Sequence, residues 1–216
     1  MADPSEHDPA PGPSGVQGLV EVMWRLRREC PWDAEQTHHS LVTYLVEEAA
    51  EVIDAIETGD LADLREELGD LLLQVVFHCE IEAQRGGFTL ADVADDIAAK
   101  LVRRHPYVFA DAAVPDDLLS SWEARKRAEK RRTSALDGIP DALDTLARAH
   151  KVISRSRHHG LDPLALVGDG GIGEQILALV AQAQDAGVDA DQATRQALRQ
   201  LEGRIREQES SPGRAG

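Results

Sequence analysis

The chain has 216 residues, of which 42% are hydrophobic, so it can bury a core and is not expected to be disordered as a whole. Lys and Arg number 23 against 39 Asp and Glu, which gives a formal net charge of −16. This charge argues against a nucleic-acid polymer or an anionic membrane as the main partner, because both are bound through basic surfaces.

The cysteines and the two ends of the chain favour a cytoplasmic protein. Cys30 and Cys79 are too few for a disulfide framework and form no C-x-x-C motif, as expected of a reduced compartment. No apolar run has the length of a membrane span, and the N-terminus lacks the pattern of a signal peptide. Residues 1–15 and 210–216 are rich in Pro, Gly and polar residues, so we expect both to be disordered tails.

Helical patterns follow one another along the chain, and strand patterns are nearly absent, which predicts an all-α bundle. Apolar residues recur every three or four positions from Val16 to Leu26, and the stretch CPWDAEQTHHS then reads as an irregular link. Ser40, Asp60 and Thr89 are each expected to cap the helix that follows them. The predicted helices run over about 16–29, 40–56, 60–84, 89–104, 121–132 and 141–159, with two more from about residue 173.

Two pairs of carboxylates have matched positions on the helices predicted on either side of Gly59. EExxE places Glu48 and Glu51 on one flank of the apolar stripe, and ExxD places Glu67 and Asp70 on the same flank of the next helix. The short loop ETGD makes the two helices antiparallel neighbours, so the four side chains can converge. Four oxygen ligands without His or Cys suit a hard cation such as Mg²⁺ or Mn²⁺.

The same pattern has a plainer interpretation, because glutamate is a good helix former and most acidic clusters are solvated faces. A single ExxE or ExxD motif therefore carries little information. The matched phase of two pairs across a tight hairpin is harder to explain in this way. At this stage a metal site and a solvated face both remain open.

The segment LLLQVVFHC, residues 71–79, is apolar nearly all the way round. A surface helix of a small bundle should keep one polar face. Either this helix is central in its own bundle, or a second subunit covers it. We expect an oligomer.

Basic residues gather downstream in this acidic chain. Lys100, Arg103 and Arg104 lie in the last turn of a predicted helix, where cations are favourable for the helix itself. Trp122 and Lys126 are one turn apart and could hold a base and a phosphate, although a solvated basic helix explains them equally well.

Taken in order, these pieces resemble the MazG family of nucleoside triphosphate pyrophosphohydrolases. The resemblance covers about residues 18 to 160 and rests on an ordered series of motifs. These are LRRECPWDAEQTHHSL, YLVEEAAEVIDAI, LREELGDLLLQVVFH, KLVRRHPYVFAD, WEARKRAEK and ALDGIP. It implies a MazG-like helical bundle that forms an obligate-type homodimer, and Mg²⁺-dependent hydrolysis of NTP or dNTP to the monophosphate and pyrophosphate. A house-cleaning role against non-canonical or damaged nucleotides is likewise implied by the resemblance alone.

The resemblance also implies residue roles. Its metal ligands correspond to Glu48, Glu51, Glu67 and Asp70. Glu47 would lie near the nucleotide or the attacking water and serve as the catalytic carboxylate. The nucleotide would be bound by Glu47, Lys100, Arg103, Arg104, Trp122 and Lys126. Metal ions would bridge acid to phosphate, since carboxylates cannot bind a triphosphate directly.

The end of the chain resembles its middle. With Gly69 placed on Gly173, Glu67 falls on Gly171 and Asp70 on Glu174, so the metal positions are not kept. We therefore expect a catalytic domain over 16–160 and a degenerate half-repeat of a second MazG-like domain over 161–209. Chance similarity between two Ala- and Leu-rich helical hairpins is the alternative.

Other functions fit less well. A ferritin-like di-iron protein needs two Glu-x-x-His motifs, and the chain has only Glu35 to His38, in the predicted link. An HD-type phosphohydrolase would rest on His7 and Asp8, which lie in the expected tail. The non-enzymatic alternative is a helical dimer that acts as a regulatory or binding module. The preferred nucleotide does not follow from the sequence.

Overall fold

The computed structural model describes residues 14–118, 121–122, 125–126, 129, 133–168 and 170–210. Over these ranges the chain forms helices, turns and loops without a β-strand, which confirms the all-α prediction. No helix within them is long and apolar enough to cross a membrane. The chain divides into two compact units, Met1–Ala112 and Ala113–Gly216. This division does not coincide with the boundary predicted at residue 160.

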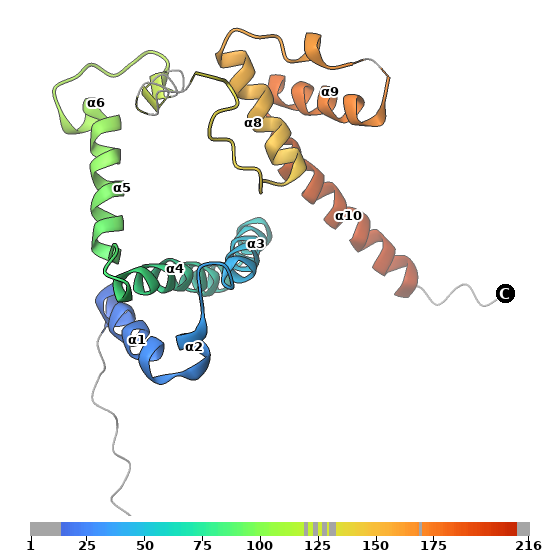
Figure 1. Ribbon diagram of the computed structural model, residues 1–216. Coiled ribbons are helices and arrows are strands. Elements are labelled where there is room, and N and C mark those ends of the chain that lie inside the picture. The colour runs from blue at the N-terminus through green and yellow to red at the C-terminus, as the bar shows by residue number, and fades with distance from the viewer. Residues whose placement is uncertain are drawn as a thin grey trace, which may run out of the picture. The chain divides into compact units, whose positions relative to one another are not determined.

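In the first unit, α1, α3 and α5 all contact one long helix, α4 (Figure 1). The core lies where α1, the start of α3 and α4 meet, and its five buried side chains are at most 3% exposed: Met23, Leu41, Val76, Phe77 and Ile81. The helices of this unit are α1 (Gly15–Glu29), α2 (Pro31–Glu35), α3 (Val42–Thr58), α4 (Leu61–Gln84), α5 (Leu90–Arg104) and α6 (Pro106–Phe109).

The end of α3 and the starts of α4 and α5 follow from local chemistry, as predicted. Gly59 ends α3 in the left-handed conformation with φ 80°, which a residue with a side chain rarely adopts. One carboxylate oxygen of Asp60 accepts the backbone N–H groups of Ala62 at 2.9 Å and Asp63 at 3.2 Å, so Asp60 caps α4. Thr89 forms a reciprocal capping box with the third residue of α5. These caps fix the tight turn that joins α3 to α4.

Two local predictions are wrong. The stretch after Cys30 is not wholly irregular, because Pro31 occupies the first turn of the short helix α2, where its missing N–H costs nothing. Ser40 does not cap α3, which begins at Val42. The Ser40 hydroxyl instead donates to Gln36 Oε1 at 2.8 Å and accepts the backbone N–H of Thr37 at 2.9 Å. The link is thus a hydrogen-bonded turn of its own.

The predicted all-round apolar part of α4 has one buried and one exposed side. The buried side faces α1 and α3, as expected for a central helix. Leu68, Leu72 and Val75 form a stripe on the other side and are 37–48% exposed. The central position of α4 therefore accounts for only part of its apolar surface.

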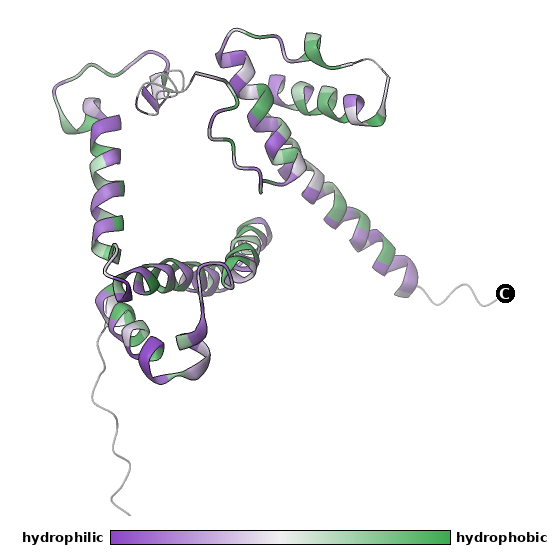
Figure 2. Cartoon of the chain, viewed as in Figure 1, coloured by the Kyte–Doolittle hydropathy of each residue, from purple (hydrophilic) through white to green (hydrophobic). Residues whose placement is uncertain are grey.

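The second unit is built on α8 (Thr145–His158), with Ala149 and Ile153 of α8 packed on Val180 and Ala181. The helix predicted from residue 141 begins at Thr145 instead, and the one predicted over 121–132 lies largely outside the described residues. Along α10, hydrophobic and hydrophilic residues alternate (Figure 2). The other elements are the 3-10 turn Leu164–Leu166, α9 (Ile172–Asp185) and α10 (Ala190–Ser210).

The Asp60 cap gives a first prediction. Asp60→Ala should lower the free energy of unfolding of the protein by about 1 kcal/mol, because two N–H groups at the start of α4 lose their acceptor. Urea denaturation measures the change. Asp63→Ala removes the same charge from the same turn without removing a cap, so equal losses in the two variants would contradict the capping role.

Candidate metal and nucleotide site

The sequence periodicity of α3 turns one glutamate toward α4. Leu41, Glu48 and Ala55 are seven residues apart, so they share one face of the helix. Leu41 and Ala55 are buried at 1% and 3% exposure, and Val52 on the same face is also buried. Glu48 is therefore a half-buried acid in an otherwise apolar row.

On α4 the facing row is spaced by three or four residues and contains Glu67, Asp70, Gln74, Phe77 and Ile81. Its last three members are buried, and its first two are half-buried acids. The α4 row thus changes from apolar to acidic toward the turn that joins it to α3, and the α3 row has its single acid between apolar residues. The two acidic parts face each other because the helices are antiparallel neighbours.

Three of the four predicted ligands come together at this place. Glu48, Glu67 and Asp70 each offer one carboxylate oxygen, and the three oxygens lie within 4.8 Å of one another. Glu51 is outside this group and more exposed. The matched helical phase predicts that both motifs converge. The structure shows this for Glu48 of the first pair and for Glu67 and Asp70 of the second.

The electrostatics of the group include Glu51 as well. Partial burial raises the pKa of Glu48, and the charges of Asp70 and Glu51 and a side-chain hydrogen bond with Glu51 raise it further. Partial burial also raises the pKa of Glu67, followed by the charges of Glu51 and Asp70. Like charges held this close favour a shared proton or a cation between them.

Of the remaining predicted residues, Glu47 is next to Glu48 on α3, and the predicted cations of α5 lie further away. Glu47 is exposed, and its charge is the smallest of the causes that raise the pKa of Glu48. Lys100 is half-buried, Arg103 exposed and Arg104 6% exposed, all in the last turns of α5. These turns lie about 20 Å along α5 from the point where it leaves α4, at 1.5 Å per residue, and α5 points away from the α3–α4 hairpin (Figure 1).

Trp122 and Lys126 belong to the second unit, and the carboxylates belong to the first. Both are helical and half-buried, and they are one turn apart as predicted.

Sequence reasoning missed Gln74, the next member of the α4 row after Asp70. Its side chain is 5% exposed, and its Oε1 has no hydrogen-bond partner among the described residues. A buried acceptor without a donor is uncommon, because desolvating it costs free energy. Glu67, Asp70 and Gln74 are three and four residues apart, so extending the same helix face by one turn beyond Asp70 would have identified Gln74.

Sequence reasoning also missed a histidine pair further along the same hairpin. His38 and His78 join Nδ1 to Nδ1 at 2.7 Å, and His38 Nε2 lies 2.7 Å from Glu82 Oε1. The hydrogen bond from His38 lowers the pKa of Glu82, while burial and His38 lower that of His78. This network ties the turn before α3 to α4.

The raised pKa values predict how the metal-free protein responds to pH. Carboxyl groups whose pKa is raised in the folded state stabilise it when protonated, and this stabilisation is lost as the pH rises through the raised values. In EDTA, the contribution of Glu48 and Glu67 should therefore decline as the pH rises above about 4.3. Glu67→Gln should reduce this decline in melting temperature more than Glu66→Gln, because the charge of Glu66 is only a minor cause of the raised pKa of Glu67. Superimposable pH profiles for the parent and Glu67→Gln would contradict the coupling.

Comparison with known proteins assigns the region that contains α3, α4 and α5 to a family. The profile of the MazG nucleotide pyrophosphohydrolase domain matches residues 36–109, which contain both acidic motifs and the cations of α5. An uncharacterised 26.1 kDa protein of Streptomyces cacaoi is 46% identical over 184 residues, covering 83% of this chain and 76% of the relative.

Two further relatives carry the name nucleoside triphosphate pyrophosphohydrolase. The one from Mycobacterium tuberculosis is 42% identical over 190 residues, covering 87% of this chain and 56% of the relative. The one from Escherichia coli K12 is 44% identical over 155 residues, covering 68% of this chain and 59% of the relative. The chain thus spans less than two thirds of these two relatives. With the domain profile lying over both acidic pairs and identities of this size, the chain belongs to the MazG family.

Proposed function

We propose that the chain hydrolyses nucleoside triphosphates to monophosphates and pyrophosphate at the carboxylate group between α3 and α4. The observation that carries this proposal is the approach of Glu48, Glu67 and Asp70 within 4.8 Å, from two motifs on two helices. The names of the relatives from Mycobacterium tuberculosis and Escherichia coli support the reaction class. The family profile covers the same helices.

The residues present fit a hard divalent cation, for which we propose Mg²⁺, with Mn²⁺ as a substitute. Three carboxylate oxygens lie close together without His or Cys among them, a donor set that hard cations prefer. The raised pKa values of Glu48 and Glu67 reflect a repulsion that a cation would remove. When bound, such an ion neutralises polyphosphate charge and stabilises the leaving pyrophosphate.

The chain's own residues would hold the cation, accept a proton from the attacking water and bind the nucleotide. Glu48, Glu67 and Asp70 hold the cation, and Glu51 assists through its hydrogen bond and charge on Glu48. Glu47 is exposed beside them, so its carboxylate can accept the proton of the water that breaks the bond between the α- and β-phosphates. Lys100, Arg103, Arg104, Trp122 and Lys126 bind the phosphates and the nucleoside in this proposal.

A homodimer would explain two features of the first unit. Leu68, Leu72 and Val75 on α4 and Val46, Ile53 and Ile56 on α3 are 37–66% exposed, more apolar surface than one unit normally leaves open. A second copy that covers this surface could also bring its α5 cations toward the carboxylates. Within a single chain, the length of α5 separates these cations from the carboxylates.

We place this dimer in the cytoplasm. Because its chain has a net charge of −16, we propose neither a nucleic-acid polymer nor a membrane as its partner. Non-canonical or damaged nucleotides are the substrates we propose for it.

The second unit is proposed to be a degenerate copy of the first, without a metal site. Arg27 of α1 donates to Gln84 of α4 at 2.8 Å, and Arg157 of α8 donates to Gln184 of α9 at 3.3 Å. Shortly after these glutamines, Gly86 and Gly187 have φ of 75° and 71°. These likenesses support a copy that begins at α8, earlier than residue 161.

The reaction is tested by removing one proposed ligand, Glu67, and the acid that supports Glu48, Glu51. Glu51→Gln and Glu67→Gln should each lower pyrophosphate release from mixed NTPs with Mg²⁺ by more than about 100-fold, because the cation and phosphate are no longer held in place. Circular dichroism and light scattering should show an unchanged fold and mass, and Glu66→Gln should keep parent activity. Activity near the parent level in either variant would refute the assignment, and NDP with phosphate as products would refute the reaction.

Metal binding is tested separately by thermal unfolding. Mg²⁺ or Mn²⁺ should stabilise the folded state by about 2.7 kcal/mol at a concentration 100 times its Kd, since only the folded chain assembles the site. The shift in Tm should disappear in Asp70→Asn and persist in Glu66→Gln. Melting curves of the parent that coincide in EDTA and in Mg²⁺ would show that the acids form a solvated face.

A further inference from the structure

We propose that the second unit binds a medium-chain carboxylate, a small molecule with an apolar chain and one acidic head, in a cavity beside α8. All residues that line this cavity belong to the second unit. The proposal therefore does not rest on the proposed function, whose metal site lies in the first unit. It gives a role to a unit that this function leaves without one.

The cavity has the size and the lining of a small-molecule site. Its volume is about 810 Å³, within the range of about 300–1,000 Å³ that is usual for ligand pockets. Its wall is mostly apolar and includes Leu136, Val152, Leu161, Leu166 and Leu177. Leu136, Leu161 and Leu166 remain 49–76% exposed. An apolar wall that stays open to solvent favours a ligand with an apolar body.

A comparison of the two cores shows why this space is left. In the first unit, Leu41 from the segment between α1 and α4 completes the core. Among the described residues, the core between α8 and α9 includes no residue of the segment that joins these two helices. Leu161 and Leu166 of that segment line the cavity instead of joining the core. The chain therefore leaves apolar surface beside α8 for another molecule to cover.

One face of α8 runs along the cavity and is polar at both ends. Thr145, Arg148, Val152, Ser156 and His159 all line the cavity and follow one another at spacings of three or four residues. The apolar Val152 lies in the middle of this row. From Arg148 to Ser156 the helix rises by about 12 Å, at 1.5 Å per residue. This length suits a medium-chain acyl group laid along the helix.

The two ends of α8 differ in the charge that they favour. Arg148 lies near the N-terminus of α8, where the helix dipole also favours a negative group. Ser156 and His159 lie at the C-terminal end, where the exposed carbonyl groups disfavour an anion. The carboxylate is accordingly assigned to the end at Arg148, and the apolar chain to the wall around Val152.

Arg148 already holds a carboxylate that a ligand can replace. Its Nη2 lies 2.7 Å from Asp141 Oδ1, and its Nη1 donates to the Asp141 carbonyl oxygen at 3.2 Å. The side chains of Arg148 and Asp141 are 43% and 91% exposed, and ion pairs this exposed contribute little to stability. A ligand whose chain is bound in the cavity presents a second carboxylate to the same guanidinium. Its apolar contacts give it an advantage that Asp141 lacks.

Isothermal titration calorimetry of the full chain tests the head group with octanoate and octanol, in EDTA so that no metal competes for the carboxylate. The parent should bind one octanoate per chain. Arg148→Gln should weaken octanoate binding by about tenfold, since a charge-assisted hydrogen bond contributes on that order, and should change octanol binding less than twofold. Asp141→Asn should strengthen octanoate binding by about threefold, because it removes a weak competitor.

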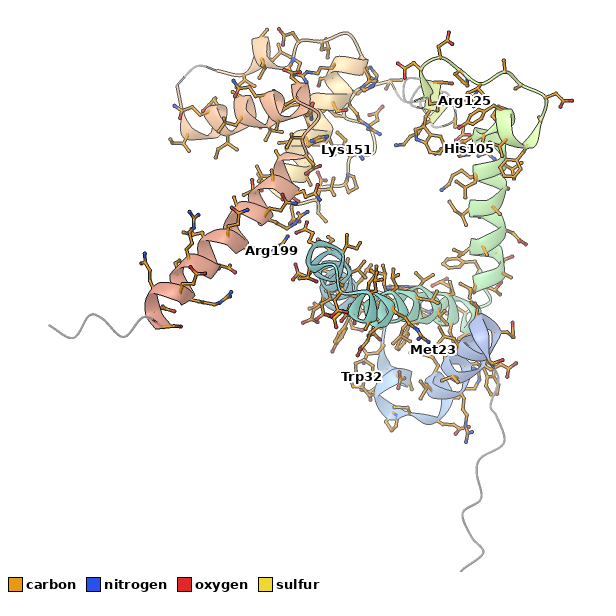
Figure 3. All side chains as sticks on the ribbon, turned by 180° about the vertical axis from the view of Figure 1, so that it is seen from behind. Met23, Trp32, His105, Arg125, Lys151 and Arg199 are labelled. Atoms are coloured by element: carbon orange, nitrogen blue, oxygen red, sulfur yellow. The ribbon has the colours of Figure 1, made fainter. Side chains whose placement is uncertain are left out.

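The matched control for Arg148→Gln is Lys151→Gln. Lys151 is an exposed cation of the same helix (Figure 3), and it does not line the cavity. This variant makes the same change in net charge, so it should keep the parent affinity for both ligands.

Two further variants test the apolar part of the cavity. Val152→Trp fills its middle and should abolish binding of both octanoate and octanol. Leu166→Ser changes an exposed side chain outside the core and should weaken both by about fivefold through the loss of apolar contact. Circular dichroism checks the fold, and Leu166→Ser decides the question if Val152→Trp does not fold.

Four outcomes would overturn the proposal. A parent that does not bind octanoate has no such site. Parent affinity in folded Val152→Trp and in Leu166→Ser would place the ligand elsewhere, and equal losses in Arg148→Gln and Lys151→Gln would remove the carboxylate from Arg148. A smaller mass of both cavity variants than of the parent in light scattering would show that a second copy covers the cavity. None of these outcomes depends on pyrophosphate release, so the proposed function stands or falls separately.

Discussion

The central constraint on the first unit is the repulsion between three carboxylates that the fold holds close together. Glu48 occupies a position between Leu41 and Ala55 that periodicity would give to an apolar side chain, and it faces Glu67 and Asp70 there. Burial and neighbouring charge both raise its pKa, so the metal-free fold holds these acids at a cost. Three acids held within 4.8 Å of one another could hold a positively charged ligand.

The rest of the unit serves to hold these acids in register. Gly59 and Asp60 make a turn short enough that α3 must run back along α4, and the buried contacts of Leu41 with Phe77 set the pairing further along. The His38–His78–Glu82 network fastens the far end. A hairpin fixed at both ends cannot slide by one residue without separating the acids, which explains why local caps and a distant core contact matter for chemistry.

The sequence was most informative for features that depend on contacts within a single helix. Periodicity and capping residues predicted α4, α5 and the acidic rows, because these depend on neighbours three or four residues away. Ser40 was misassigned because a turn of side-chain hydrogen bonds competes for the same hydroxyl. Gln74 and the histidine pair were missed because their importance arises from contacts between helices. The distance of the α5 cations from the acids depends on the direction in which a whole helix leaves the core, which no local pattern encodes.

The most direct test of the account is an anomalous difference map from a crystal of the protein grown with Mn²⁺. The account predicts a peak between the side chains of Glu48, Glu67 and Asp70, with carboxylate oxygens as its ligands, and the loss of this peak in Glu48→Gln. Full Mn²⁺ occupancy at another site, with no peak between α3 and α4, would contradict it.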